Sequence, residues 1–172
     1  YQQVTLAIAK RCYLSQLGYA DVTLERGHIF GQVPFPLLDI HIANQSYAYQ
    51  LNAYNLMNFM EFVSDNYLAV NSDFYFNGFF FNKIPLLKKL KLREVASFKI
   101  LYGSIRDENN PSKNTDVYQF PKNNLGGIPV QTTYSLNKTP YVEASVGIAN
   151  IFKIIRLDLV KRFTYLDHPD IS

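Results

Sequence analysis

The fold is decided by residues 141–165, which read YVEASVGIANIFKIIRLDLVKRFTY. Apolar residues alternate with polar or small ones up to residue 149, and the alternation resumes after a turn near residues 150–153. Because successive side chains of a β-strand point to opposite faces, the pattern predicts two strands that share one apolar face. Each arm, at about 10 residues, is long enough to cross a bilayer as a tilted strand. A transmembrane β-barrel is therefore the leading hypothesis for the fold.

The overall composition agrees with strands that are apolar on one side only. The 172 residues are 48% hydrophobic and 15% aromatic, yet the mean hydropathy is only -0.10, which is typical of transmembrane strands. No run of about 18 apolar residues occurs in the sequence, which excludes a transmembrane helix. The formal net charge is +3, with acids and bases interspersed, so we expect no nucleic-acid partner. The single cysteine, Cys12, leaves the redox compartment open.

Four more strands are predicted upstream of residue 141. The alternation indicates strands over residues 3–16, 19–30, 67–81 and 93–105. Leu17 and Gly18 form a tight turn after the first strand, and Gly27 and Gly31 permit a bulge or a bend in the second. With the closing pair, these segments make six strands of an antiparallel sheet, so we expect an all-β fold.

The connections between the predicted strands alternate between short and long. Residues 32–65 form a long apolar and aromatic loop, in which Leu56, Phe59, Met60 and Val63 have the spacing of a short helix. Residues 82–92 form a basic, amphipathic connector that could lie at a membrane surface, and residues 106–139 have the polar composition of a solvated loop. Transmembrane barrels have short turns at one rim and long loops at the other, so the alternation of short and long connections favours a barrel over a soluble sandwich.

Six strands are too few to close a transmembrane barrel, because the smallest such barrels have about eight and no strand edge is left unpaired in lipid. The chain begins at Tyr1 already inside an alternating pattern. We therefore interpret residues 1–172 as the C-terminal part of one outer-membrane barrel domain, and we expect further strands outside this sequence.

Four motifs carry a resemblance to a known family. They are PFPLLDIHIANQSY at residues 34–47, NLMNFMEFVSDNY at 55–67, FNGFFFNKIPLLKKL at 76–90 and VGIANIFK at 146–153. In this order they resemble the C-terminal part of a Bacteroidota outer-membrane family, which carries an N-terminal carboxypeptidase-regulatory-like domain and a barrel of unassigned function. The resemblance spans most of residues 18–171. It implies a protein that is integral to the outer membrane of a Gram-negative bacterium.

The strand order also resembles the last third of the barrels of about sixteen strands in the BAM-type assembly and two-partner secretion superfamily. In that superfamily a long loop folds into the lumen and carries an Arg-Gly-aromatic signature. Residues 32–65 occupy the corresponding place, and they offer His41, Asn44, Gln45 and Tyr47 in place of that signature. The resemblance implies that this loop lies in the lumen and that the protein assists the assembly, insertion or translocation of envelope proteins.

Charged residues on the less apolar face of the strands are the main candidate site. We expect these residues to face the barrel lumen: Asp73, Arg93, Lys99, Glu143, Arg156, Asp158 and Arg162. Charges inside a barrel are hydrated or paired across neighbouring strands. The set is therefore either a lattice of salt bridges that holds the wall or a group of charges that lines a path or binds a plug. Lys161 falls on the apolar side, which predicts a position near a membrane interface or at a bulge.

The sequence favours neither a metal site nor catalysis. His28, His41 and His168 lack the spacing of metal ligands, and no nucleophile motif occurs. We therefore expect no cofactor, no metal and no enzymatic activity. The acidic run Asp107–Asn110 could bind Ca²⁺ through oxygen ligands, but a solvated loop is the simpler interpretation.

Three functions are compatible with these features. The first is an outer-membrane barrel that helps to assemble, insert or translocate envelope proteins. The second is a passive channel or a structural subunit of a larger outer-membrane complex, and the third is a soluble β-sandwich that binds a partner. For the first two, the expected partners are outer-membrane lipid and other outer-membrane or periplasmic proteins. Because a fold does not fix a function, the position of residues 32–65 is the observation that discriminates best.

Overall fold

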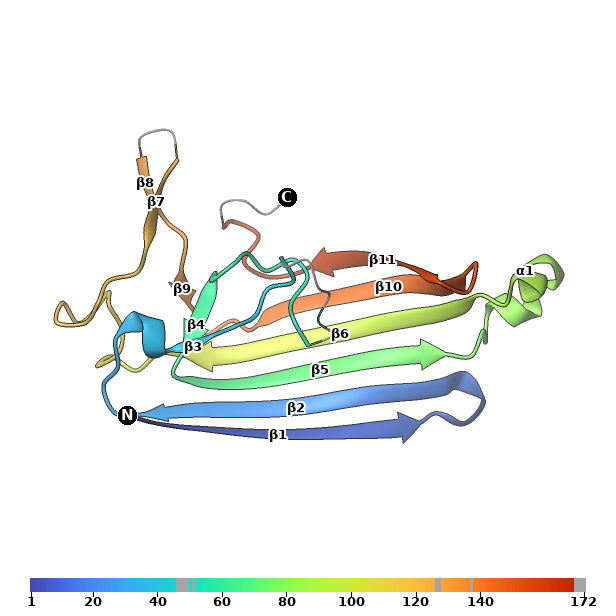
Figure 1. Cartoon of the computed structure of the whole chain (residues 1–172), viewed down its shortest axis with the longest axis horizontal. Coiled ribbons are helices and arrows are strands. Elements are labelled where there is room, and N and C mark those ends of the chain that lie inside the picture. The colour runs from blue at the N-terminus through green and yellow to red at the C-terminus, as the bar shows by residue number, and fades with distance from the viewer. Residues whose placement is uncertain (46–49, 51, 126–127, 137, 169–172) are drawn as a thin grey trace.

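The computed structural model describes residues 1–45, 50, 52–125, 128–136 and 138–168. Its main element is a six-stranded antiparallel sheet with the strand order β1-β2-β5-β6-β10-β11 (Figure 1). The strands are β1 (Gln2–Tyr13), β2 (Gly18–Phe30), β5 (Asn66–Phe76), β6 (Arg93–Ser104), β10 (Tyr141–Ile151) and β11 (Ile155–Arg162). The prediction of an all-β chain with six antiparallel strands is confirmed. Among the described residues β1 does not pair with β11, so the sheet is open and not a closed barrel.

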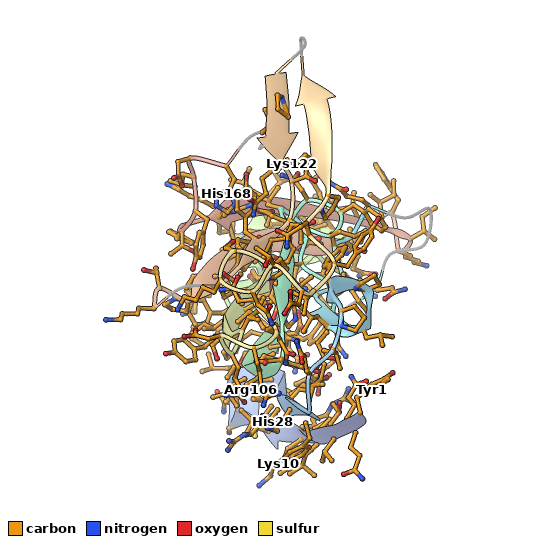
Figure 2. All side chains as sticks on the ribbon, turned by 90° about the vertical axis from the view of Figure 1, so that its left-hand side faces the viewer. Tyr1, Lys10, His28, Arg106, Lys122 and His168 are labelled. Carbon is orange, nitrogen blue, oxygen red and sulfur yellow. The ribbon has the colours of Figure 1, made fainter. Side chains whose placement is uncertain are left out.

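One end of the sheet carries the long connections, and we call it the loop end (Figure 1). Here lie the 3₁₀ turn η2 (Phe35–Leu37) and a small sheet of β3 (Asp39–Ile40), β4 (Phe62–Ser64) and β9 (Tyr134–Ser135). A separate hairpin of β7 (Lys122–Leu125) and β8 (Ile128–Gln131) projects away from the rest of the chain (Figure 2).

The opposite end of the sheet carries the shorter connections, and we call it the turn end. Its elements are the 3₁₀ turns η1 (Ser15–Leu17) and η3 (Phe81–Lys83) and the helix α1 (Pro85–Leu90). Figure 1 shows α1 beyond the ends of the strands, at the same end as the β10-β11 turn. Within the described ranges, no helix is both long enough and apolar enough to span a membrane.

The strand register assigns the side chains of the sheet to two faces. Lys99 lies directly opposite Asn71 on β5 and Glu143 on β10, and Glu143 lies opposite Arg162 on β11. Opposite residues of a ladder share a face, so these polar residues lie on one side, which we call the inner face. The other side, the outer face, exposes large apolar side chains: Leu6, Ile8, Leu24, Leu68, Phe98, Tyr102, Val146, Leu157 and Leu159.

The apolar core lies between the long loops and the inner face, at the loop end. One cluster joins Tyr54, Met57 and Phe62 of the loop to Leu101 and Tyr141 of the sheet. A second cluster lies between β2 and segments of both long connections. The long loop is therefore packed on the inner face, and the outer face is left uncovered by the described part of the chain.

The short helix expected near residues 56–63 is wrong. Phe62 and Val63 belong to β4, and the backbone of residues 56–61 forms no helix. The carbonyl of Leu56, which an α-helix would pair with the N–H four residues later, accepts a hydrogen bond from Nη1 of Arg162. Met60 has a φ of 58°, which lies in the left-handed region that interrupts a right-handed helix. Tertiary contacts of the loop thus override the helical spacing of its apolar residues.

Two details of the predicted strands are also wrong. The strand expected over residues 67–81 ends at Phe76, because Gly78 adopts a φ of 76° and the chain turns into η3. The bulge or bend allowed at Gly27 is absent, because the register with β1 and β5 runs through this residue without a shift. Gly27 instead makes room for Tyr67: a Cβ at this position would lie 2.1 Å from Cε1 of that ring.

Residues 106–139 are less solvated than their polar composition predicts. They contain β7, β8 and β9, and the side chains of Asn109, Phe120 and Leu136 are buried. Phe120 and Leu136 belong to the two core clusters. The second long connection therefore closes the core at the loop end.

The contact between Gly27 and Tyr67 gives a test of the register. Gly27→Ala should lower the free energy of unfolding by about 1 to 3 kcal/mol, the usual cost of overpacking, because the new methyl group meets the Tyr67 ring. Denaturant unfolding measures this loss. In a Tyr67→Ala background the same substitution should cost much less, and equal costs in both backgrounds would contradict the contact.

Candidate functional site

Three buried charges on the inner face form the candidate site. Lys99 of β6, Glu143 of β10 and Arg162 of β11 are neighbours across the sheet, and each is at most 3% exposed. A buried charge destabilises a protein unless it is paired and hydrogen-bonded. The long loop supplies hydrogen-bond partners to all three side chains. We call this set of contacts the loop seat.

The Glu143 carboxylate binds backbone N–H groups of the long loop. Its Oε1 accepts the N–H of Asn55 at 2.9 Å, and its Oε2 accepts the N–H of Leu56 at 3.1 Å and the hydroxyl of Tyr141 at 2.9 Å. Two consecutive N–H groups that point at one carboxylate form a small anion site, and such hydrogen bonds to a charge are stronger than neutral ones. The carboxylate therefore fixes the course of the loop.

Arg162 binds both a side chain and the backbone of the loop. Its Nη1 and Nη2 donate to Oε2 and Oε1 of Glu61 at 2.9 and 2.6 Å, in the bidentate geometry that suits a guanidinium. Nη1 also donates to the carbonyl of Leu56 at 3.1 Å. Nδ1 of His168 lies 2.7 Å from Oε1 of Glu61, so Glu61 joins the loop to both β11 and the chain beyond it.

Lys99 completes the seat, because its Nζ donates to the backbone carbonyl of Ala53. The sheet thus presents one anion that accepts backbone N–H groups and two cations that donate to backbone carbonyls. Apart from the Glu61 carboxylate, the main partners on the loop are main-chain atoms. The seat is chemically suited to hold an extended polypeptide largely independently of its sequence.

A second polar cluster joins the two long connections at the loop end. Oδ2 of Asp65 accepts hydrogen bonds from the Nε of Arg106 at 3.0 Å and from the Nδ2 of Asn109 at 2.9 Å. Oδ1 of Asn109 accepts the N–H of Val33 at 2.8 Å, and Nη2 of Arg106 donates to the carbonyl of Ile29 at 2.7 Å. Arg106 lies at this end of the molecule in Figure 2. This cluster anchors the start and the end of the long loop.

The seven charged residues predicted for the polar face all lie on the inner face, but only three of them meet in the seat. Arg156 and Asp158 form their own pair, with N–O distances of 2.6 and 2.9 Å, and Asp73 lies within electrostatic range of both. Arg93 is exposed near the turn end. That the inner face lines a lumen stays a prediction.

The loop residues proposed as a lumen motif mainly hold the loop in shape. Nε2 of His41 lies 2.7 Å from Oγ of Ser64. The side chains of Asn44 and Gln45 bond to two other residues of the same loop, at 2.8 and 2.9 Å. Tyr47 lies outside the described residues. These contacts stabilise the loop conformation that reaches the seat.

An acidic cavity of about 270 Å³ lies beside the seat, and Glu25, Asp39, His41 and Asn71 contribute to its lining. Burial raises the pKa of Asp39 to about 6, and the negative charges of Glu25 and Asp65 add to this rise. Burial also lowers the pKa of His41 to about 3, so this imidazole is neutral at physiological pH. The cavity therefore combines carboxylates without a histidine cation to balance them.

The acidic run at residues 107–110 does not converge on a cation. Asp107 pairs with Lys113 at 2.7 Å, Glu108 pairs with Arg106, and Asn109 is buried in the anchoring cluster. In the part of the chain that the structure describes, no group of three or more His, Cys, Asp or Glu side chains could hold a metal ion. The run is therefore better explained by the ion pairs and hydrogen bonds that it makes.

Lys161 is the penultimate residue of β11, next to the loop end, and its Nζ lies 5.7 Å from the ring centroid of Phe163. It pairs with Ala144 in regular register, so the predicted bulge is not at this position. That Lys161 lies near a membrane interface stays a prediction.

Sequence reasoning missed Glu61, Asp65, Arg106 and Asn109. One signal could have found the first: Glu61 is the only charged residue between positions 42 and 64, within an apolar and aromatic stretch. A lone charge in such surroundings needs a partner of opposite sign when it is buried. The other three have no comparable signal, because their contacts join segments that are far apart in sequence.

Comparison with known families identifies the chain's relatives. Residues 1–108 match the C-terminal domain of a family of unknown function, DUF5686. The chain belongs to this family. No curated protein and no solved structure gives a significant match. The DUF5686 match includes β1 to β6 and the whole long loop, with Glu61 and Lys99, whereas Glu143 and Arg162 follow it in the sequence.

The Glu61–Arg162 pair gives a test of the seat. Glu61→Gln should lower the free energy of unfolding by about 3 to 5 kcal/mol, because it leaves the Arg162 guanidinium buried without its counter-ion. Asp107→Asn is the control, since the side chains of Asp107 and its partner Lys113 are 76% and 59% exposed and the loss should stay below about 1 kcal/mol. Denaturant unfolding compares the two, and similar small losses would rule out a buried pair.

The acidic cavity gives a test by pH. The folded-state pKa of Asp39, about 6, lies above its ordinary value of 3.8. The protonated form therefore stabilises the fold, and this contribution is lost as pH rises through about 6. Asp39→Asn should raise the free energy of unfolding by about 1 to 2 kcal/mol near pH 8, after a discount for partial exposure, and by little below about pH 4.

Thermal or denaturant unfolding at the two pH values measures the Asp39 effect. Asp116→Asn, at an exposed position in the second long connection, is the control and should give no pH-dependent gain. A gain at Asp39 of equal size at both pH values would contradict a carboxyl that resists ionisation.

Proposed function

We propose that this DUF5686 domain is part of an integral outer-membrane β-barrel that assists the assembly, insertion or translocation of envelope proteins. The observation that carries the proposal is the loop seat, in which Lys99, Glu143 and Arg162 bind main-chain groups of the long loop. Main-chain recognition gives affinity without demanding a particular sequence. The same charges could therefore receive an extended segment of a client protein when the loop moves away.

The outer face supports a location in the membrane. Leu6 is 63% exposed, Val146 61%, Leu157 67% and Leu159 75%. Soluble monomers rarely leave such side chains together on one surface, whereas lipid removes them from water. The strands β1, β2, β5, β6 and β10 have between 11 and 13 residues, which is sufficient for a tilted crossing. The edge strand β11 has 8 residues, which is shorter than the sequence pattern predicted.

The two edge strands support closure into a larger barrel. Within the described residues, β1 pairs only with β2 and β11 pairs only with β10. In hydrocarbon, each unpaired backbone N–H or C=O group costs several kcal/mol, so open edges are not tolerated there. The proposed barrel therefore needs strands in addition to these six, from the same polypeptide or from another.

The chemistry of the seat supports a loop that can leave and return. If the loop moves away in a hydrated lumen, water can solvate Lys99, Glu143 and Arg162, and ions are well solvated by water. A seat made only of apolar side chains would instead expose hydrophobic surface in the open state. Charged wall residues thus reduce the free-energy difference between a closed and an open lumen.

A passive channel or a structural subunit of a larger complex is the second candidate. It is favoured by Arg156, Asp158 and Asp73, which lie on the inner face nearer the turn end. The side chains of Arg156 and Asp158 are 28% and 24% exposed. Partly hydrated charges of this kind are typical of water-filled barrels that conduct ions.

Conductance and depletion distinguish the two candidates. In planar bilayers the full-length protein should be mostly closed, and Glu143→Gln should raise its open probability several-fold by weakening the backbone contacts of the loop. Asp107→Asn, outside both the seat and the anchoring cluster, is the control. Depletion of the protein in cells should lower the levels of other outer-membrane proteins. Steady wild-type conductance together with unchanged envelope proteins would favour the passive channel and overturn the assembly role.

A further inference from the structure

The turn end of the sheet carries a basic and apolar surface that the proposed function does not use. It consists of the connector at residues 77–92 and the β10-β11 turn at residues 150–154, and we call it the basic rim. We propose that the basic rim binds the anionic headgroups of membrane phospholipids and thereby fixes the depth of the domain in the bilayer. This inference rests on the proposed barrel and names a lipid class for its turn end.

The two segments of the basic rim form one surface. Nδ2 of Asn150 donates to the backbone carbonyl of Lys91 at 2.6 Å, which ties the turn to the end of α1. A groove of about 480 Å³ runs between them and is lined on one side by Lys89 and Leu90 and on the other by Phe152 and Lys153. Both segments lie at the same end of the sheet in Figure 1.

The charge of the basic rim has one sign. Its exposed lysines are Lys83, Lys88, Lys89, Lys91 and Lys153. Neither segment contains an aspartate or a glutamate. The nearby carboxylate of Glu94 accepts the N–H groups of Phe80 and Phe81 at 3.0 and 2.6 Å, so it is already engaged in capping the connector. The lysines of these two segments are therefore not neutralised by a carboxylate of the same segments, which leaves a positive surface that can attract phosphate groups.

The apolar side chains of the rim indicate that the phosphates belong to lipids. Leu86 is 75% exposed, Phe152 83% and Ile154 87%, which water alone would not favour. The apolar surface of the outer face reaches the connector, because Phe80 lines one groove together with Val146 and Leu157. At the level of lipid headgroups we expect lysines to surround apolar side chains. The apolar groups enter the edge of the bilayer, and the ammonium groups extend to the phosphates.

The position of the basic rim at the turn end of the sheet also favours phospholipid. Outer-membrane barrels have short turns on the periplasmic side and long loops on the outside. The basic rim is the short-turn end, so it would meet the inner leaflet of the outer membrane. The occupant is therefore an anionic phospholipid headgroup held by several lysines and flanked by apolar contacts with the acyl chains.

The test compares insertion of the full-length protein into vesicles of phosphatidylcholine alone and vesicles that also contain phosphatidylglycerol. The inserted fraction is measured by protease protection. Wild-type protein should insert into the anionic vesicles at least about tenfold faster at low salt, since each lysine near an anionic surface contributes attraction. High salt should reduce this preference.

Two triple variants with the same change in net charge separate the rim from the rest of the chain. One replaces Lys88, Lys89 and Lys91 by Gln at the turn end. The control replaces Lys113, Lys122 and Lys138 by Gln at the loop end. The rim variant should lose most of the preference for anionic vesicles, and the control should keep it.

The outcomes distinguish this inference from the proposed barrel. If all three proteins insert into both kinds of vesicle and the rim variant keeps the anionic preference, the basic rim is not a headgroup site although the barrel stands. Equal losses in the rim variant and the control would show a general charge effect and overturn the inference as well. If the wild-type protein inserts into neither vesicle, the barrel itself fails and the lipid site with it.

Discussion

A charge that is buried away from water must find a partner, and this requirement decides how the long loop lies on the sheet. Lys99, Glu143 and Arg162 are almost fully covered, and the partners that permit this burial come from residues 53–61. Removing either side of such contacts leaves an uncompensated ion, which is far more destabilising than the loss of an ordinary hydrogen bond. The loop is therefore irregular because its main-chain groups serve the ions of the sheet and are not available to a helix.

The sheet has two faces that suit two different solvents. The outer face presents large aliphatic side chains, and the inner face presents charges that are either covered by the loop or partly hydrated. The two ends differ in a similar way, with anchored long connections at one and a lysine-rich rim at the other. The proposed barrel and the proposed headgroup site both rest on these asymmetries of the DUF5686 domain.

Main-chain recognition connects the stability of the domain to its proposed role. The seat binds main-chain groups: its carboxylate accepts consecutive N–H groups and its cations donate to carbonyls. These contacts do not depend on the side chains of the bound segment. The resident loop adds one specific contact, the ion pair of Glu61 with Arg162. This single pair can favour the resident loop over other segments, while the generic contacts leave the seat open to a competing extended chain.

The sequence by itself determined the six strands, their faces and the inward set of charges, because a period of two residues is a local property of the chain. It did not determine which of those charges meet. Lys99, Glu143 and Arg162 converge only through register and loop packing, and the anchor of Asp65, Arg106 and Asn109 joins segments separated by some 40 residues. The helix predicted near residues 56–63 is absent for the same reason, since the carbonyl of Leu56 accepts Arg162 and Phe62 and Val63 pair with other strands. The periodicity of the sequence determines the face to which a side chain points, whereas only the tertiary structure decides which groups it contacts there.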